Sequence, residues 1–318
     1  MIGSHFGSVD CFARRTLFLL TMLVFAGTAR AQSAPTTPAT GAEQQTPSGN
    51  TALPPPVDPN QGALSLSGGF DFLNRYMFRG IRQHSTGLAA WPWADLSIAA
   101  YSGESGLKSV GVNVGSWNSQ HTGDTGMHGP SAKLWYESDF YATLGFGFGG
   151  GNSFSTTYTA YTSPNEGFTT VKEIMFKYAL DDSGYLGKAA IKPYLAIAQE
   201  FDTGPGRGQA DAGAHAGTYM EIGFAPGLAV PKASIAFPIK VGLSLSDYYE
   251  NPLTGEDEKF GFFSIAGIVT VPLGGTTSFG SWNVHGGVEY QKLGTTTEIF
   301  NGGDSNQVIG SFGIGFSY

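Results

Sequence analysis

The chain has a single cysteine, Cys11, so it has no intrachain disulfide and no cysteine-rich metal site. Cys11 precedes an apolar run, Thr16 to Gly27, which follows Arg14-Arg15 and leads to Ala29-Arg30-Ala31. This order is typical of a secretory signal peptide. An internal helix or a membrane anchor is the alternative, but the run is shorter than the ~20 residues of a spanning helix. We expect residues 1–31 to be removed, which leaves a mature chain without thiol chemistry.

Charged residues are also scarce, at 13% of the chain, whereas ordinary soluble domains contain ~25%. After residue 31 the chain keeps 14 basic and 24 acidic residues, a formal net charge of −10. Nucleic acids are bound through clustered Lys and Arg. We therefore expect no nucleic-acid partner.

Long apolar runs are missing after residue 31. The longest candidate, Phe260 to Gly275, is interrupted by Gly, Thr and Pro. This pattern excludes a helical membrane protein. A chain of this kind that spans a membrane must close its backbone hydrogen bonds as a β-barrel.

Glycine and aromatic residues are abundant, with 47 Gly and 13% aromatics. Residues 32–62 differ from the rest because they are rich in Pro, Thr and Ala and too polar to form a core. We interpret them as a flexible periplasmic linker, with a partner-binding or peptidoglycan-associated segment as the alternative. Residues 63–318 form the expected folded domain.

This domain alternates between apolar and polar residues with a period of two, in runs bounded by Gly, Pro, Asn, Asp and Ser. About twelve runs are expected: 63–78, 93–101, 107–117, 133–148, 153–161, 169–180, 189–201, 217–227, 233–246, 260–273, 281–292 and 307–318. The fold class is therefore all-β. A soluble secreted sandwich, such as a lectin, would alternate in the same way.

The connections between the runs favour a closed antiparallel transmembrane β-barrel of about 12 strands. Long polar connections (79–92, 118–132, 162–168, 202–216, 247–259 and 293–306) alternate with shorter ones, such as 149–152 and 228–232. Long external loops, short periplasmic turns and an even strand number are typical of outer-membrane barrels. We expect the outer membrane of a Gram-negative bacterium, with both termini in the periplasm.

Aromatic residues on the apolar face support this interpretation. Trp282 and Tyr290 lie eight residues apart on one face, about 27 Å along a strand, which fits two interfacial girdles. The final run places Phe312, Ile314, Phe316 and Tyr318 on one face. This ending resembles the signal that the barrel-assembly machinery reads, so that machinery is an expected partner.

Two motifs resemble an uncharacterised family of proteobacterial outer-membrane proteins. Tyr76-Met77-Phe78-Arg79-Gly80-Ile81-Arg82-Gln83 is similar to its Tyr-x-Phe-Arg-Gly-Ile-Ser-Gln signature. Gly115-Ser116-Trp117-Asn118-Ser119, with Glu137-Ser138-Asp139-Phe140-Tyr141, is similar to its later Trp-x-Ser and Glu-x-Asp-x-Tyr stretch. The resemblance covers residues 66–150 and implies an outer-membrane barrel without a settled substrate. Arg82 stands where the family usually has Ser, and the spacing between the Trp-x-Ser and Glu-x-Asp-x-Tyr segments is longer than in the family.

The face opposite the apolar one would line the lumen and carries charges of both signs. Its members are Asp71, Arg75, Asp95, Lys133, Glu137, Asp139, Glu173, Lys177, Lys192, Glu200, Glu221, Lys240, His285 and Glu289. The excess of acids predicts a mild cation preference, although a slip of one residue would exchange the faces of a strand. These charges either line an open lumen or pair across it and fill it.

Three loop features contain residue types that occur in chemical sites. His84-Ser85 could serve a lipid hydrolase, although no Gly-x-Ser-x-Gly elbow occurs. His121, Asp124 and His128 could bind a metal by residue type, and Asp247, Glu250, Glu256, Asp257 and Glu258 could collect divalent cations that bridge to lipopolysaccharide. Solvated loop residues explain each pattern, so we expect no catalytic site, no metal and no cofactor.

The resulting hypothesis is a passive outer-membrane channel for small hydrophilic solutes, surrounded by outer-membrane lipid and lipopolysaccharide. The alternative is a plugged structural or surface-binding barrel without transport. An outer-membrane lipid hydrolase comes third.

Overall fold

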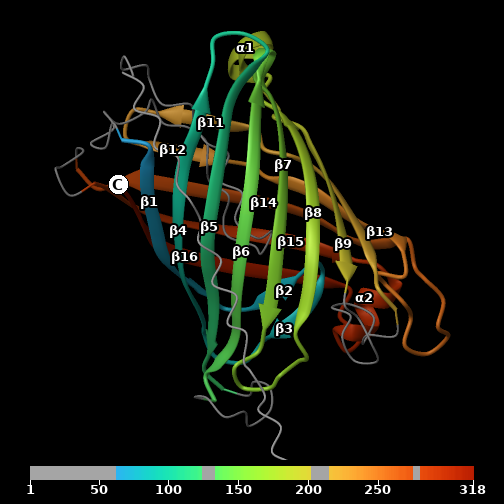
Figure 1. The fold of residues 1–318 in the computed structure, drawn as a ribbon. Coiled ribbons are helices and arrows are strands. Elements are labelled where there is room, and N and C mark those ends of the chain that lie inside the picture. Colours follow the sequence, from blue (N-terminus) through green and yellow to red (C-terminus); the bar gives the residue numbers. More distant parts are fainter. Residues whose placement is uncertain (1–61, 124–132, 202–214, 275–279) are drawn as a thin grey trace, which may run out of the picture. The chain divides into compact units, whose positions relative to one another are not determined.

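The computed structural model describes residues 62–123, 133–201, 215–274 and 280–318 (Figure 1). The expected signal peptide and nearly all of the expected linker lie outside these residues. No helix among the described residues is long and apolar enough to span a membrane.

Within the described residues, twelve antiparallel strands form a closed barrel, as the sequence predicted. The barrel strands are β1 (Leu64–Leu73), β4 (Ala89–Ser102), β5 (Leu107–His121), β6 (Trp135–Phe148), β7 (Asn152–Thr162), β8 (Val171–Leu180), β9 (Tyr194–Phe201), β10 (Thr218–Phe224) with β11 (Gly227–Val230), β12 (Ala233–Ala236) with β13 (Ile239–Ser246), β14 (Phe260–Pro272), β15 (Ser281–Leu293) and β16 (Asn306–Ser317). Each strand pairs with its neighbour in sequence, and β1 pairs with β16 to close the ring, from Ser67↔Ser317 to Leu73↔Ser311.

Two of the predicted strands are each broken by a proline. β10 and β11 are separated by Ala225-Pro226, and β12 and β13 by Phe237-Pro238. Proline cannot donate to a strand ladder, so the regular pairing is interrupted at both places. The carbonyl of Pro226 accepts the N–H of Phe237 at 2.9 Å, which holds the two breaks side by side.

The strand expected at 189–201 begins only at Tyr194. The preceding residues form α1 (Ser183–Leu186) and the 3-10 turn η2 (Gly187–Ala189). Asp182 accepts the backbone N–H groups of Ile191 and Lys192 at 3.2 and 2.9 Å, and Pro193 has no N–H to offer a ladder. This connection is therefore longer than the sequence pattern indicated.

The barrel ends differ in their connections. One end, which we call the turn end, carries the connections 103–106, 149–151, 181–193, 231–232 and 273–280 together with the start of β1 and the end of β16. The other, the loop end, carries 74–88, 122–134, 163–170, 202–217, 247–259 and 294–305. Apart from 181–193, the predicted alternation of long and short connections is present.

Large apolar side chains cover the outer face of the strands. Phe140, Phe312 and Val288 are each about 60% exposed, and Trp282 and Tyr290 are exposed on β15 as the alternation predicted. So many exposed large apolar side chains are rare on soluble domains and are typical of the apolar band of a membrane barrel.

Many glycines face the interior, where they make room for aromatic rings of the neighbouring strand. Four cross-strand pairs place a glycine directly opposite an aromatic residue: Gly69↔Trp93, Gly115↔Tyr141, Gly223↔Tyr194 and Gly242↔Phe262. A Cβ at any of these glycines would overlap the partner ring. The abundance of glycine therefore reflects packing inside the barrel as well as turns.

Candidate functional site: the barrel interior and its inner hairpin

The first long connection does not extend away from the barrel as a polar external loop. β1 ends at Leu73 rather than at residue 78, and the chain forms a separate hairpin of β2 (Tyr76–Phe78) and β3 (Ile81–His84). All of β2 is buried, as are Arg79 and Ile81. Figure 1 shows β2 and β3 behind the wall formed by β6 to β8. We call residues 76–84 the inner hairpin.

A two-residue turn makes the inner hairpin possible. Phe78 pairs with Ile81, and the residues between them, Arg79 and Gly80, have φ values of +46° and +84°. Hairpin turns of type I′ need positive φ at both central positions. Gly80 adopts this at no steric cost, while Arg79 is strained. Because Asn or Asp usually precedes glycine in such a turn, the sequence pattern did not reveal it.

Arg79 anchors the hairpin tip to the barrel wall. Its Nη1 and Nη2 donate to Oε2 and Oε1 of Glu173 on β8 at 2.6 and 2.9 Å, and Nη1 also donates to the Tyr248 hydroxyl at 2.8 Å. The guanidinium carbon lies 4.2 Å from the ring centre of Tyr219. Both side chains of the ion pair are at most 2% exposed. A two-point arginine–carboxylate pair is among the strongest polar contacts in a protein.

The other side of the tip is bound by the last loop-end connection. This connection contains α2 (Thr295–Phe300), and Asn301 directly follows the helix. Asn301 Nδ2 donates to the carbonyl of Gly80 at 2.8 Å, and its Oδ1 accepts the N–H of Arg82 at 3.1 Å. One buried amide therefore satisfies two backbone groups of the hairpin that the barrel strands cannot reach.

The base of the inner hairpin packs into an aromatic cluster. The Tyr76 ring lies 5.1 Å from that of Trp91 and 5.6 Å from that of Trp117. Trp91 Nε1 donates to Ser119 Oγ at 2.9 Å, and Ser119 Oγ lies 2.7 Å from His121 Nε2. At the loop end the barrel interior is thus filled by packed side chains.

The histidines considered from the sequence belong to this packed region. His84 is buried, with Nε2 2.9 Å from the carbonyl oxygen of Thr122, whereas Ser85 is exposed. The two side chains therefore point apart and do not form a nucleophile pair. His121 is fully buried against Tyr136, with ring centres 4.5 Å apart. Asp124 and His128, the other residues of the considered metal set, lie outside the described residues.

Beside the aromatic cluster the interior is polar, since Asp71 pairs in register with Trp91. Asp71 on β1 contacts His285 on β15 and accepts a hydrogen bond from Trp93 Nε1 at 3.0 Å. His285 Nδ1 lies 2.9 Å from Asn283 Oδ1. These side chains come from β1, β4 and β15, and β16 lies between β1 and β15. Asp71 is buried, but the His285 side chain is 12% exposed.

A second polar group surrounds Glu221 on β10. The hydroxyls of Tyr194 and Tyr219 donate to its carboxylate, the latter at 2.6 Å. Lys240 Nζ lies 3.8 Å from the same carboxylate, and Lys177 Nζ lies 4.2 Å from the ring centre of Tyr194. The Lys240 side chain is 19% exposed, whereas those of Arg79 and Glu173 are at most 2% exposed, so packing is less tight around Lys240.

The remaining residues expected to line the lumen have the following positions. Asp95 accepts a hydrogen bond from the Tyr141 hydroxyl at 2.8 Å. Glu289 accepts one from Ser264 and another from Gln291, the latter at 2.9 Å. Arg75 donates a hydrogen bond to Gln307. Glu137 and Asp139 are buried on β6, and Glu200 accepts the N–H of Gly217 at 3.0 Å. Lys192 lies in the 181–193 connection and Lys133 is exposed in a loop, so neither belongs to a strand.

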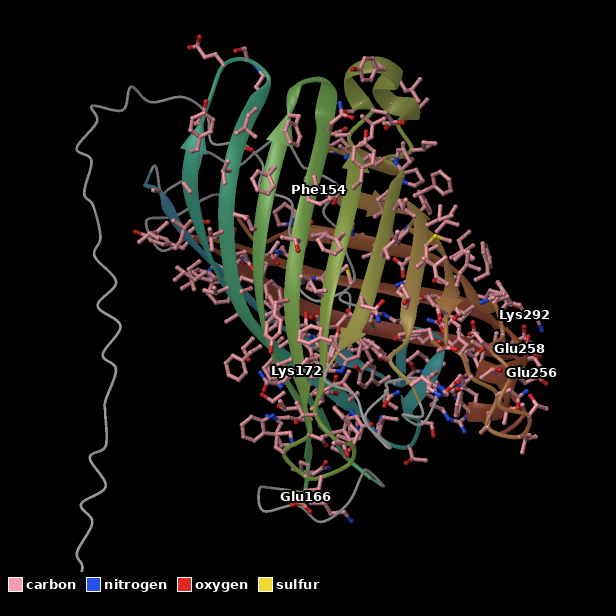
Figure 2. All side chains as sticks on the ribbon, turned by 45° about the vertical axis from the view of Figure 1, so that its right-hand side comes forward. Phe154, Glu166, Lys172, Glu256, Glu258 and Lys292 are labelled. Carbon is pink, nitrogen blue, oxygen red and sulfur yellow. The ribbon has the colours of Figure 1, made fainter. Side chains whose placement is uncertain are left out.

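The acidic loop 247–259 has an ordered arrangement. Glu250 and Asp257 form an isolated antiparallel bridge. Burial by itself raises the pKa of Asp257, but hydrogen bonds from Lys259 and Ser244 outweigh it and hold this pKa below its ordinary value. Figure 2 shows Glu256 and Glu258 close together at the barrel margin, and Glu256 is exposed.

No protein-family model and no curated protein matches the chain. Solved structures of similar fold include an outer-membrane channel from Pseudomonas putida F1, with 11% identity, coverage of 84% of this chain and 97% of that chain, and a TM-score of 0.42. The translocator domain of the autotransporter NalP from Neisseria meningitidis has 12% identity, coverage of 81% and 89%, and a TM-score of 0.38. The NanC porin has 14% identity, coverage of 80% and 99%, and a TM-score of 0.36.

Proposed function

We propose that this barrel lies in the outer membrane of a Gram-negative bacterium, with its turn end in the periplasm, and conducts small hydrophilic solutes. The inner hairpin closes the loop end in the conformation described here. The observation that carries the proposal is the partly exposed, charged lining of the interior beside the packed hairpin. Charged side chains of both signs, including Asp71, Glu221 and Lys240, line this region, where Lys240 and His285 keep some exposure. A barrel that only needed to be filled would gain more from apolar side chains there.

The placement in a membrane rests on the outer face. Its exposed apolar side chains would be unfavourable in water, and the pairing of β1 with β16 closes the ring, as a hydrocarbon environment requires. The long connections then lie outside the cell. Outer-membrane lipid and lipopolysaccharide would surround this face. The exposed Phe312 and Ile314 of β16, with the exposed Tyr318 directly after it, suit recognition by the barrel-assembly machinery, which stays a prediction.

The second candidate is a closed structural barrel that passes no solute. The contacts of Arg79 favour it, since the Arg79–Glu173 pair and the bonds from Asn301 hold the hairpin at both sides of its tip. In the channel interpretation, the same contacts form a reversible closure, because the hairpin is joined to the wall by side chains and not by the barrel ladder.

Planar-bilayer conductance separates the two candidates. In the test variant, a Gly/Ser linker of equal length replaces residues 76–84. In the control variant, a Gly/Ser linker of matching length replaces residues 103–106 at the turn end. A channel closed by the hairpin gives rare or small current steps for the native protein and the control, and larger, frequent steps for the hairpin variant. If the hairpin variant folds and also passes no current, the barrel is structural.

Folding and location must be checked on the same preparations. A membrane-fraction band that shifts on boiling before SDS electrophoresis identifies the folded barrel. An unshifted band in the soluble fraction would contradict the membrane placement. The reversal potential in a salt gradient then tests the expected mild cation preference.

A further inference from the structure

A separate group of side chains gathers at the loop end, outside the barrel interior. His215 precedes β10, and Asp247 and Glu250 follow β13. Each of these residues offers one potential ligand atom, and the three atoms all lie within 4.8 Å of one another. Neither the inner hairpin nor the polar groups around Asp71 and Glu221 involve them.

The barrel register brings these residues together. β10 and β13 are neighbours, and Thr218 pairs with Ser246 at their loop-end limit. Beyond this pair the two chains stay close, because a Cβ on Gly217 would lie 2.8 Å from the Cα of Tyr248. Asp247 has a φ of +51°, which reverses the chain so that Glu250 returns towards His215. The group is therefore set by strand pairing and a local turn.

Glu250 supplies the observation that points to a ligand. Its side chain is 9% exposed, and Oε1 lies 2.6 Å from His215 Nδ1. The second oxygen, Oε2, is buried and has no hydrogen-bond partner among the described residues. A buried carboxylate oxygen without a donor is costly. A cation held by this carboxylate would remove that cost.

We propose that His215, Asp247 and Glu250 form a binding site for a divalent transition-metal ion, for which Zn²⁺ is the best fit. Calcium and magnesium prefer oxygen ligands, whereas an imidazole with two carboxylates suits zinc. Three protein ligands leave one tetrahedral position for water or an external group. Zinc–ligand distances of ~2.0–2.2 Å require only a small approach of the three side chains, and the His215 side chain, 66% exposed, is able to turn.

The site does not depend on the proposed channel function. Its ligands come from two loop-end connections, so a bound ion would link the end of the β9–β10 connection to the acidic loop 247–259. Zinc would thereby order the external surface beside the closed end of the barrel.

The test is isothermal titration of the refolded, tag-free barrel in detergent with ZnCl₂ alone, after treatment with a chelator. The variants are His215→Ala, Asp247→Asn and Glu250→Gln, and the matched control is Glu166→Gln in the β7–β8 connection. Boiling-dependent gel migration shows that each is folded. A second titration uses CaCl₂.

The expected result is one saturable zinc site per chain, weakened at least tenfold in each of the three ligand variants and unchanged in the control. Calcium should not compete at tenfold excess. Two results would overturn the proposal: a native barrel without a saturable zinc site, or zinc binding that folded His215→Ala and Glu250→Gln variants retain in full. In either case the His215–Glu250 contact is a hydrogen bond that involves no metal ion.

Discussion

Arg79 and Glu173 form a bidentate ion pair inside the barrel although 94 residues separate them, with donor–acceptor distances of 2.6 and 2.9 Å. The pair joins the tip of the inner hairpin to β8. Because both side chains are buried, neither charge has access to bulk water. The pair is therefore one of the contacts that hold the hairpin inside the barrel.

Glu173→Gln should destabilise the inner hairpin strongly. The substitution leaves the buried Arg79 charge uncompensated, and removal of one partner of a buried pair costs about 3–5 kcal/mol. Urea unfolding in detergent, followed by tryptophan emission, measures the loss. The double variant Arg79→Met/Glu173→Leu, which removes both charges, should regain much of it. Equal stability of Glu173→Gln and the native protein would contradict the importance of the pair.

Asn301→Ala should loosen the hairpin tip without opening the barrel. The change removes the partner of the Gly80 carbonyl and of the Arg82 N–H. Each buried backbone group left without a partner costs about 1–3 kcal/mol. Hydrogen exchange should accelerate in residues 80–84 while the barrel ladders keep their protection. Asp304→Asn, which alters only an exposed ion pair with Arg82, is the control and should leave the exchange nearly unchanged.

Gly313→Ala should destabilise the barrel, whereas Gly310→Ala on the same strand should not. A Cβ on Gly313 would collide with the Asp71 carboxylate and lie 2.7 Å from His285 Nε2, but a Cβ on Gly310 meets nothing within 4 Å. Overpacking of this kind costs about 1–3 kcal/mol. The measurement is the temperature at which the folded band disappears on SDS gels. Identical temperatures for the two variants would show that the Asp71–His285 contact adapts freely.

Asp257 should make the acidic loop sensitive to acid. Its pKa lies below the ordinary value in the folded protein, so its contribution is present at neutral pH and is lost as the pH falls through the folded pKa. The native protein should exceed Asp257→Asn in stability at pH 7, and the difference should vanish between about pH 5 and pH 3. If the stability difference between the two proteins is the same at all three pH values, its cause is not the titration of Asp257.

The interior could be read from the sequence only in part. In the predicted run 233–246, the period-two pattern correctly separated the buried Ser234 of β12 and Ser244 of β13 from the exposed Leu245 of β13. It placed Lys192 on a strand because pattern alone does not register that Asp182 holds the N–H groups of Ile191 and Lys192 in a turn. His215 was missed altogether, since its partners lie more than 30 residues away.

The sequence by itself determined the closed antiparallel barrel, its twelve strands and its apolar outer face, because alternation and turn residues act over a few neighbouring positions. It could not determine what fills the barrel. The motif from Tyr76 to Gln83 is short and lacks the Asn-Gly or Asp-Gly pair that usually marks a two-residue hairpin turn. Its position inside the barrel depends on contacts with Glu173, Tyr248 and Asn301, which closure of the ring brings close to it. Contacts between such distant residues arise only from the tertiary structure, because no local pattern records which strands will face one another across the interior.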